Sequence, residues 1–271
     1  MNIRKKHYIL YILLPLLFSC AHSGDSKDRL VQIRTDLGNI TVRLYNETPI
    51  HRDNFLKLVN SQIYDSLSFH RVIKGFMIQA GDPASKKGYS PVKNDTLCSY
   101  TIPAEFNRKL FHKRGALAAA REGIEVNPEM RSSGTQFYIV QGIKYSDDEL
   151  NKAEQRINNG IQQALFRKLM KQVSDSNTIA GTNLSPAAIQ EKVSLKMFEI
   201  LSTEGKYKIP EEQRNTYRTV GGAAHLDGNY TVFGEVVEGM ETVDMIAGAK
   251  TDDSDRPLKD IRILKMKVIR K

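Results

Sequence analysis

The sequence predicts a mainly β fold: a closed antiparallel β-barrel with flanking helices and a long helical insertion. Many short segments alternate apolar and polar residues, which is the pattern of antiparallel strands. Glycine turns separate these segments, and a barrel closes such a set of strands without leaving free edges. Between residues 146 and 216 the pattern changes, and apolar residues recur every three or four positions, as on a helix.

The composition is that of an ordinary globular protein. The 271 residues are 40% hydrophobic and 26% charged, and two cysteines are too few for a disulfide-stapled scaffold. The net charge of +9 lies partly in the basic cluster Arg4-Lys5-Lys6, and the chain holds no Lys/Arg run of five or more. We therefore expect no nucleic-acid partner.

The first 19 residues have the pattern of an export signal. The basic cluster is followed by an apolar stretch, residues 8–18, which is too short to span a membrane comfortably. The stretch ends in Leu17-Phe18-Ser19-Cys20, which resembles the lipobox of bacterial lipoproteins. The resemblance implies cleavage before Cys20, lipidation of Cys20 and a polar tether over residues 20–27. A plain secretory signal with a chance cysteine is the alternative.

This resemblance implies a place in the cell. Two or three acyl chains on Cys20 would hold the protein stably on a membrane, whereas one alone would be marginal. We expect a lipid-anchored protein of the cell envelope, on the outer membrane and facing the periplasm of a Gram-negative bacterium.

A β-hairpin and a helix open the folded domain, which we expect to begin at residue 28. Apolar residues alternate on both sides of a turn at residues 36–39, which predicts a hairpin over 30–45. Thr48-Pro49 then supplies a cap and a first-turn proline for a helix that ends near Asn60.

Further strands and one helix follow at intervals along the chain. In the last strand the apolar phase shifts between Ile263 and Leu264, which predicts a β-bulge. The predicted strands are 69–73, 77–80, 115–120, 136–141, 230–237 and 261–269, and the predicted helix is 241–247.

The insertion, at about 146–216, interrupts this domain. Ser146 and Glu149 form a capping box before an amphipathic helix of about seven turns. A second helix begins at Ser185-Pro186 and ends before Gly205, and a third, shorter one begins at Pro210. We expect the two long helices to pack on each other; an exposed groove for unfolded proteins is the alternative.

One stretch, residues 69–83, carries the chemistry. Because alternate residues of a strand share a face, Arg71 and Gln79 can lie beside Phe76 and Met77 on a common surface. A cation and an amide beside an apolar patch suit a ligand that has an apolar ring next to a carbonyl. A surface arginine lying over apolar neighbours is the alternative.

This stretch closely resembles the signature of the cyclophilin-type peptidyl-prolyl isomerases, which read Phe-His-Arg, then Gly-Phe-Met and Gln-x-Gly-Asp. Two further blocks, residues 115–121 with 133–139 and residues 225–234, resemble the family's central segment and its late turn and strand. The resemblance covers nearly all of residues 28–271 outside the insertion, and it implies a barrel of the cyclophilin type.

The resemblance also implies roles for particular residues. Arg71 matches the catalytic arginine and Gln79 the glutamine that orients it; His70 belongs with them, with a structural, hydrogen-bonded imidazole as the alternative. Four positions match the walls of the proline pocket: Phe76, Met77, Tyr138 and Leu226. Five more surround the groove: Ala120, Arg121, Gln136, His225 and Tyr230.

The implied activity is rotation about X–Pro peptide bonds, which needs no metal and no cofactor. The partners would be proline-containing peptides and unfolded or exported proteins, whose folding the enzyme would assist. The alternative function is a non-catalytic, cyclophilin-like binding or holdase module that uses the helical insertion.

Overall fold

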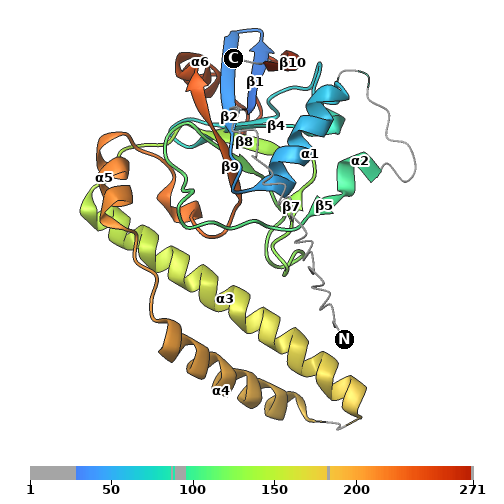
Figure 1. Ribbon diagram of the computed structural model, residues 1–271, viewed down its shortest axis with the longest axis vertical. Helices are drawn as coiled ribbons and strands as arrows, with labels where there is room; N and C mark the ends of the chain where they lie inside the picture. Colours follow the sequence, from blue (N-terminus) through green and yellow to red (C-terminus); the bar gives the residue numbers. More distant parts are fainter. Residues whose placement is uncertain (1–28, 87, 89–95, 182–183, 270–271) are drawn as a thin grey trace, which may run out of the picture.

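A computed structural model describes residues 29–86, 88, 96–181 and 184–269 (Figure 1). The predicted signal peptide, the tether and Cys20 lie outside the described residues. The chain forms a β-sheet body from which two long helices project. No helix within the described part of the chain is both long enough and apolar enough to span a membrane.

The predicted hairpin is confirmed. β1 (Arg29–Thr35) pairs antiparallel with β2 (Gly38–Leu44) in continuous register. The side chains at alternate positions are buried, because this hairpin has one face on the core. Gly38 has a positive φ of 138°, and a Cβ atom there would lie 2.6 Å from Oγ1 of Thr242. The turn and the close approach of α6 (Met240–Ala247) both require glycine at this position.

Eight strands form one sheet in the order β10-β1-β2-β9-β6-β8-β4-β3. The predicted strands are found, with ends within a few residues of those expected. Their bounds are β3 (Arg71–Ile73), β4 (Met77–Ala80), β6 (Ala116–Ala119), β8 (Phe137–Val140), β9 (Val232–Glu238) and β10 (Ile263–Ile269).

The prediction of a closed barrel was wrong. The sheet is open, with β10 and β3 as its two edges. The edge of β3 is taken by a loop instead of a strand, because the backbone N–H of Val72 donates to the carbonyl of Asp255. Hydrogen bonds between residues 66–69 and 261–263 bridge the gap beside this loop, where Ser66 has a positive φ of 70° that interrupts extended backbone.

The predicted bulge in the last strand is confirmed. Arg34 of β1 lies opposite Lys265, whereas its neighbour Thr35 lies opposite Ile263, so that Leu264 is the extra residue. The bulge turns Ile263 and Met266 toward the core although three positions separate them.

α1 (Pro49–Asn60) and α6 cover the concave side of the sheet. Thr48 is the N-cap residue of α1 and Pro49 its first residue, as predicted, but the Thr48 side chain makes no capping hydrogen bond. Phe55, Leu58 and Val59 belong to the buried face of the helix. The ring of Phe55 meets that of Phe137 of β8 edge to face, 5.4 Å between centroids. This aromatic contact joins α1 to the strand that carries one wall of the site described below.

The insertion forms three helices, α3 (Asp147–Ala180), α4 (Pro186–Glu204) and α5 (Glu211–Thr219). The predicted capping box of Ser146 and Glu149 is present, and Gly205 ends α4. At 34 residues, α3 is longer than the seven turns predicted, because polar turns extend it beyond the last apolar residue of the stripe.

The apolar stripe of α3 has two different partners. Its distal half, with Leu169 and Val173, packs on Val193 of α4, as expected for two helices that pack on each other. Its proximal half packs instead on Ile209 and Tyr217, from the end of the insertion, and on Ala224 of the body. We call residues 162–203 the arm; in Figure 1 this region points away from the sheet.

Several short elements were not predicted, because two to four residues carry no periodicity. They are the 3₁₀ turns η1 (Pro83–Ser85) and η2 (Ala224–Leu226), the helix α2 (Thr96–Ser99), and a two-stranded sheet of β5 (Thr101–Ile102) and β7 (Ser132–Ser133).

Candidate active site

Three residues from three adjacent strands form a row on the outer face of the sheet. Arg71 of β3 lies opposite Gln79 of β4, and Gln79 lies opposite Tyr138 of β8. Directly opposed residues of an antiparallel pair point to the same face, so the three side chains share one surface. Their neighbours Ile78 and Phe137 point the other way, into the core. The alternation predicted from the sequence therefore places Arg71 and Gln79 as expected.

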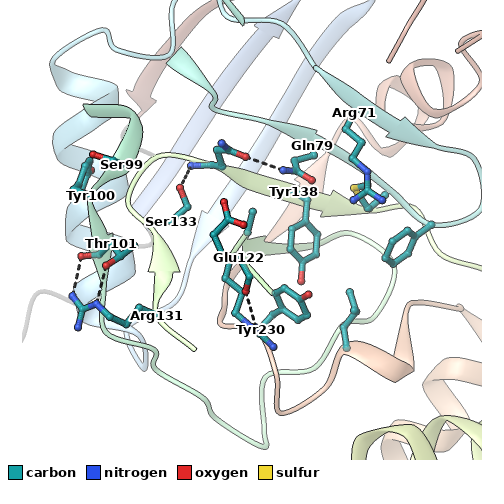
Figure 2. Close-up of a pocket in the computed structure, with 16 residues that line it drawn as sticks. Arg71, Gln79, Ser99, Tyr100, Thr101, Glu122, Arg131, Ser133, Tyr138 and Tyr230 are labelled. Carbon is teal, nitrogen blue, oxygen red and sulfur yellow. Dashed lines mark hydrogen bonds between the residues drawn. The ribbon is translucent and has the colours of Figure 1, made fainter. Parts of the chain in front are cut away.

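A cavity of about 680 Å³ lies over this row. Figure 2 shows Arg71, Gln79 and Tyr138 at one end and Thr101 and Arg131 at the other. It is lined by Arg71, Phe76, Met77, Gln79, Ser99, Tyr100, Thr101, Ala120, Arg121, Glu122, Arg131, Ser133, Gln136, Tyr138, Leu226 and Tyr230.

One end of the cavity has an apolar floor. Met77 and Tyr138 are buried, and Phe76 and Leu226 are half-buried and pack against them. Phe76 follows the β3–β4 turn, in which Gly75 has a positive φ of 75°. The floor is built from three separate segments of the chain, with Phe76 and Met77 in one, Tyr138 in another and Leu226 in the third.

Arg71 stands at the rim of this floor. Its side chain is 44% exposed, and its Nε lies 3.4 Å from a carboxylate oxygen of Asp255. Asp255 belongs to the loop that occupies the edge of β3, so the open edge of the sheet supplies a partner for the guanidinium. The remaining guanidinium donors stay available to a ligand, since the contact to Asp255 uses Nε.

The side-chain amides of Gln79 and Gln136 form a hydrogen bond with each other. Nε2 of Gln79 donates to Oε1 of Gln136 at 2.9 Å. The backbone of Gln136 is held in turn, because its N–H donates to Oγ of Ser133 and its carbonyl accepts from Ala120. The two side-chain amides are thus oriented, and amides in fixed positions suit the N–H and C=O groups of a peptide.

Arg121 and Tyr230 form the wall opposite Arg71. The Arg121 guanidinium carbon lies 4.6 Å from the centroid of the Tyr230 ring, and its Nε donates to the carbonyl of Asn229 at 2.8 Å. Tyr230 in turn meets Tyr138 edge to face at 6.0 Å. The Tyr138 and Tyr230 rings extend the apolar floor, and the Arg121 guanidinium places a second positive charge at its end.

Two predicted residues do not line the cavity. His225 lies behind Phe76, with 5.4 Å between ring centroids. His70 lies beside Arg71 in the chain, but its Nδ1 is buried without a hydrogen-bond partner. Burial lowers the pKa of both imidazoles, so both are neutral at pH 7. These positions suit support of the floor better than contact with a ligand.

Six lining residues were missed by the sequence reasoning. They come from loops, two-residue strands and the end of the short helix α2, which meet only in the folded chain. Arg131 shows this, because its guanidinium donates to both Oγ1 and the carbonyl of Thr101, 30 residues earlier. The six are Ser99, Tyr100, Thr101, Glu122, Arg131 and Ser133.

The site combines an apolar floor, a rim cation and paired amides. The arrangement can bind an apolar ring and hold a cation next to it.

Comparison with known proteins agrees with this chemistry. The family model described as "Cyclophilin type peptidyl-prolyl cis-trans isomerase/CLD" matches residues 30–176 and 202–268. A Staphylococcus aureus (strain COL) protein with the provisional name of peptidyl-prolyl cis-trans isomerase is 28% identical over 250 residues, which are 92% of this chain and 94% of that protein.

A second relative is longer than this chain. A Streptococcus pyogenes protein, provisionally named a bifunctional phosphatase/peptidyl-prolyl cis-trans isomerase, is 28% identical over 238 residues. These are 86% of this chain, which spans only 37% of that protein.

Solved structures agree on the fold. The crystal structure of a Cryptosporidium parvum cyclophilin type peptidyl-prolyl cis-trans isomerase matches with a TM-score of 0.53 at 19% identity, over 90% of this chain and 99% of that one. A structure of the same protein in the presence of the dipeptide Ala-Pro matches with a TM-score of 0.51, over 89% and 99%.

Proposed function

The chain belongs to the cyclophilin-type peptidyl-prolyl cis-trans isomerase family, and from this premise we propose that the cavity over Arg71, Gln79 and Tyr138 is where it isomerises X–Pro bonds. The observation that carries the proposal is the register of the three strands. It sets one cation and one amide directly beside the apolar floor of the cavity.

The barrier to this reaction is electronic. Rotation about an X–Pro bond must break the partial double bond of the amide, at a cost of about 18–20 kcal/mol. As the amide twists, its nitrogen becomes pyramidal and gains a localised lone pair. A fixed positive charge near that nitrogen, or near a neighbouring carbonyl, stabilises the twisted state more than the planar one, which lowers the barrier.

Arg71 meets this requirement. Guanidinium is planar, always charged and carries five donors, so one edge can be held by Asp255 while another faces the substrate. The floor of Phe76, Met77 and Leu226 would hold the ring still, and the paired amides of Gln79 and Gln136 would hold the adjoining backbone. The acyl side is then free to swing.

The test is catalysed exchange. The chain from Asp25 onward, without the signal peptide, should accelerate cis–trans exchange of a proline-containing peptide, as measured by NMR exchange spectroscopy. Absence of exchange with several peptides, in a protein that melts cooperatively, would contradict the proposal.

We propose the cell envelope as the place of action, on the pattern of the N-terminal residues. Their pattern supports export, lipidation at Cys20 and anchoring in the cell envelope, as set out above. The substrates would then be exported proteins that arrive unfolded, with X–Pro bonds that otherwise isomerise over tens to hundreds of seconds.

The arm supports a second candidate function, the holding of unfolded chains. Leu195 and Phe198 of α4 are 66% and 74% exposed, and Ile179 near the end of α3 is 87% exposed. Large apolar side chains in the open suit contact with unfolded proteins. Suppression of aggregation that survives Arg71→Ala and fails with Leu195→Ser/Phe198→Ser would separate this function from isomerisation.

A further inference from the structure

Four buried side chains form a continuous chain of hydrogen bonds behind the cavity wall. The hydroxyl of Tyr138 lies 2.9 Å from Nε2 of His112, and Nδ1 of His112 lies 2.8 Å from Oδ1 of Asp227. The other carboxylate oxygen, Oδ2, accepts a hydrogen bond of 2.6 Å from the hydroxyl of Tyr217. All four residues are buried.

The carboxylate of Asp227 determines the direction of the hydrogen bonds that it makes. An ionised carboxylate only accepts, so Nδ1 of His112 carries the proton toward Asp227, as does the backbone N–H of His112. Nε2 of His112 and the hydroxyl of Tyr138 complete the network at 2.9 Å.

Tyr217, at the far end of this hydrogen-bond network, belongs to the insertion. Tyr217 lies on α5, and its ring is held edge to face by Phe111 at 5.4 Å and by Tyr145 at 5.7 Å. The same apolar cluster contains Leu150 and Ile157 of α3. Burial raises the pKa of Tyr217 well above its ordinary value, so that the hydroxyl stays a donor.

The near end belongs to the site. Tyr138 is part of the apolar floor of the cavity. Leu226 is another part of this floor, and Asp227 directly follows it in the sequence. Loss of one donor would leave a buried carboxylate with an unmet acceptor and would let Asp227 shift. Both parts of the floor would then move, because one is bonded to Asp227 through His112 and the other is joined to it by a peptide bond.

We propose that Tyr217 is a positioning residue for the proline pocket and that it acts through Asp227 and His112 on the ring of Tyr138. The proposal rests on the isomerase function assigned to this cavity. It makes the base of the insertion a support of the active site, and it explains why a tyrosine, which carries a hydroxyl, forms this wall.

A double-mutant cycle tests the coupling. The full chain, Tyr217→Phe, Tyr138→Phe and the double variant are compared by NMR exchange with one proline-containing peptide. We expect Tyr217→Phe to raise KM about fivefold with kcat within about twofold, because the pocket is displaced and Arg71 is not. In the Tyr138→Phe background the route through His112 is already cut and only the route through Leu226 remains, so the same change should raise KM less, to about twofold.

The matched control is Tyr145→Phe, which removes the hydroxyl of another tyrosine in the same cluster and leaves the four-residue hydrogen-bond network intact. It should keep KM within about 1.5-fold. Equal KM effects of Tyr217→Phe in both backgrounds, or a fall in kcat alone with melting at lower temperature, would show a merely structural role and overturn the proposal. Should Tyr217→Phe fail to fold, Asp227→Asn replaces it in the cycle with the same expectation.

A readout that does not depend on activity separates this proposal from the proposed function. Imidazole ¹⁵N NMR should show His112 as the Nδ1–H tautomer, with nitrogen shifts that move in Tyr217→Phe and stay in Tyr145→Phe. Unmoved shifts overturn the proposal. Moved shifts in a wild-type protein that catalyses no exchange would support the coupling and contradict the isomerase site.

Discussion

Arg71 and Gln79 face each other directly across the antiparallel ladder of β3 and β4. The two side chains form the polar rim of the apolar floor, although β3 is only three residues long. Both strands are short, and β3 is an edge strand whose outer side is held by the loop at Asp255. The polar rim of the candidate site thus lies at one of the two edges of the sheet.

Replacement of Arg71 should remove catalysis and leave the fold intact. Arg71→Ala takes one strong donor from a partly desolvated site, which should cost about 3–4 kcal/mol of transition-state stabilisation, or roughly 10²–10³ in kcat/KM. Arg71→Lys should recover little, because an ammonium group lacks the planar fork. NMR exchange measures the loss.

The control for this experiment is Arg34→Ala, which removes an exposed arginine from β1, away from the cavity. Its kcat/KM should equal that of the wild type. A folded Arg71→Ala protein with wild-type exchange would place catalysis elsewhere.

Removal of the arm should spare both fold and activity toward short peptides. A short Gly/Ser linker in place of residues 162–203 deletes the distal cluster around Val193 and keeps the proximal cluster around Tyr217. We expect kcat/KM within about twofold of the wild type, since the clusters share no buried residue.

The matched variant for the arm removes residues 150–203 and with them Leu150 and Ile157. It should lose stability and activity together, because it opens the base on which Tyr217 packs. An arm deletion that cannot fold would show that the distal helices belong to the body.

The protein should lose stability as the pH falls from 7.5 to 5.5. Burial lowers the pKa of His51, His70 and His225 in the folded state, so the unfolded chain binds protons first as the pH passes about 6.5. The free energy of unfolding therefore decreases toward acid, by at most about 1.4 kcal/mol per histidine per pH unit below that value.

Urea denaturation at several pH values measures this dependence. Carboxylates with lowered pKa lose their contribution only near and below pH 4, outside this window. His51→Gln should make the slope shallower. A free energy of unfolding that stays constant or rises toward pH 5.5 is incompatible with neutral, buried histidines.

Lipidation should depend on Cys20. We expect Cys20→Ser to be exported without acylation and to leave the membrane fraction, or to stay uncleaved. Mass spectrometry of the mature N-terminus decides this, and an unmodified Cys20 in the wild-type protein would rule out the lipid anchor.

Much of the local structure could be predicted from the sequence alone. The hairpin at residues 29–44, the capping box at Ser146, the end of α4 at Gly205 and the bulge at Leu264 depend on neighbours within a few positions. Alternation along β3 and β4 likewise placed Arg71 and Gln79 on one face before any contact was known.

Only the tertiary structure determines which residues far apart in the chain contact one another. The sheet is open, and not the closed barrel predicted from the sequence, because the loop at Asp255 occupies the edge of β3. The position of Arg131 depends on its hydrogen bonds to Thr101. Likewise, Tyr217 and Tyr138 are joined only through Asp227 and His112. Periodicity and caps report the backbone of one segment, whereas these contacts arise from how separate segments bury their side chains against each other, which is decided when the chain packs.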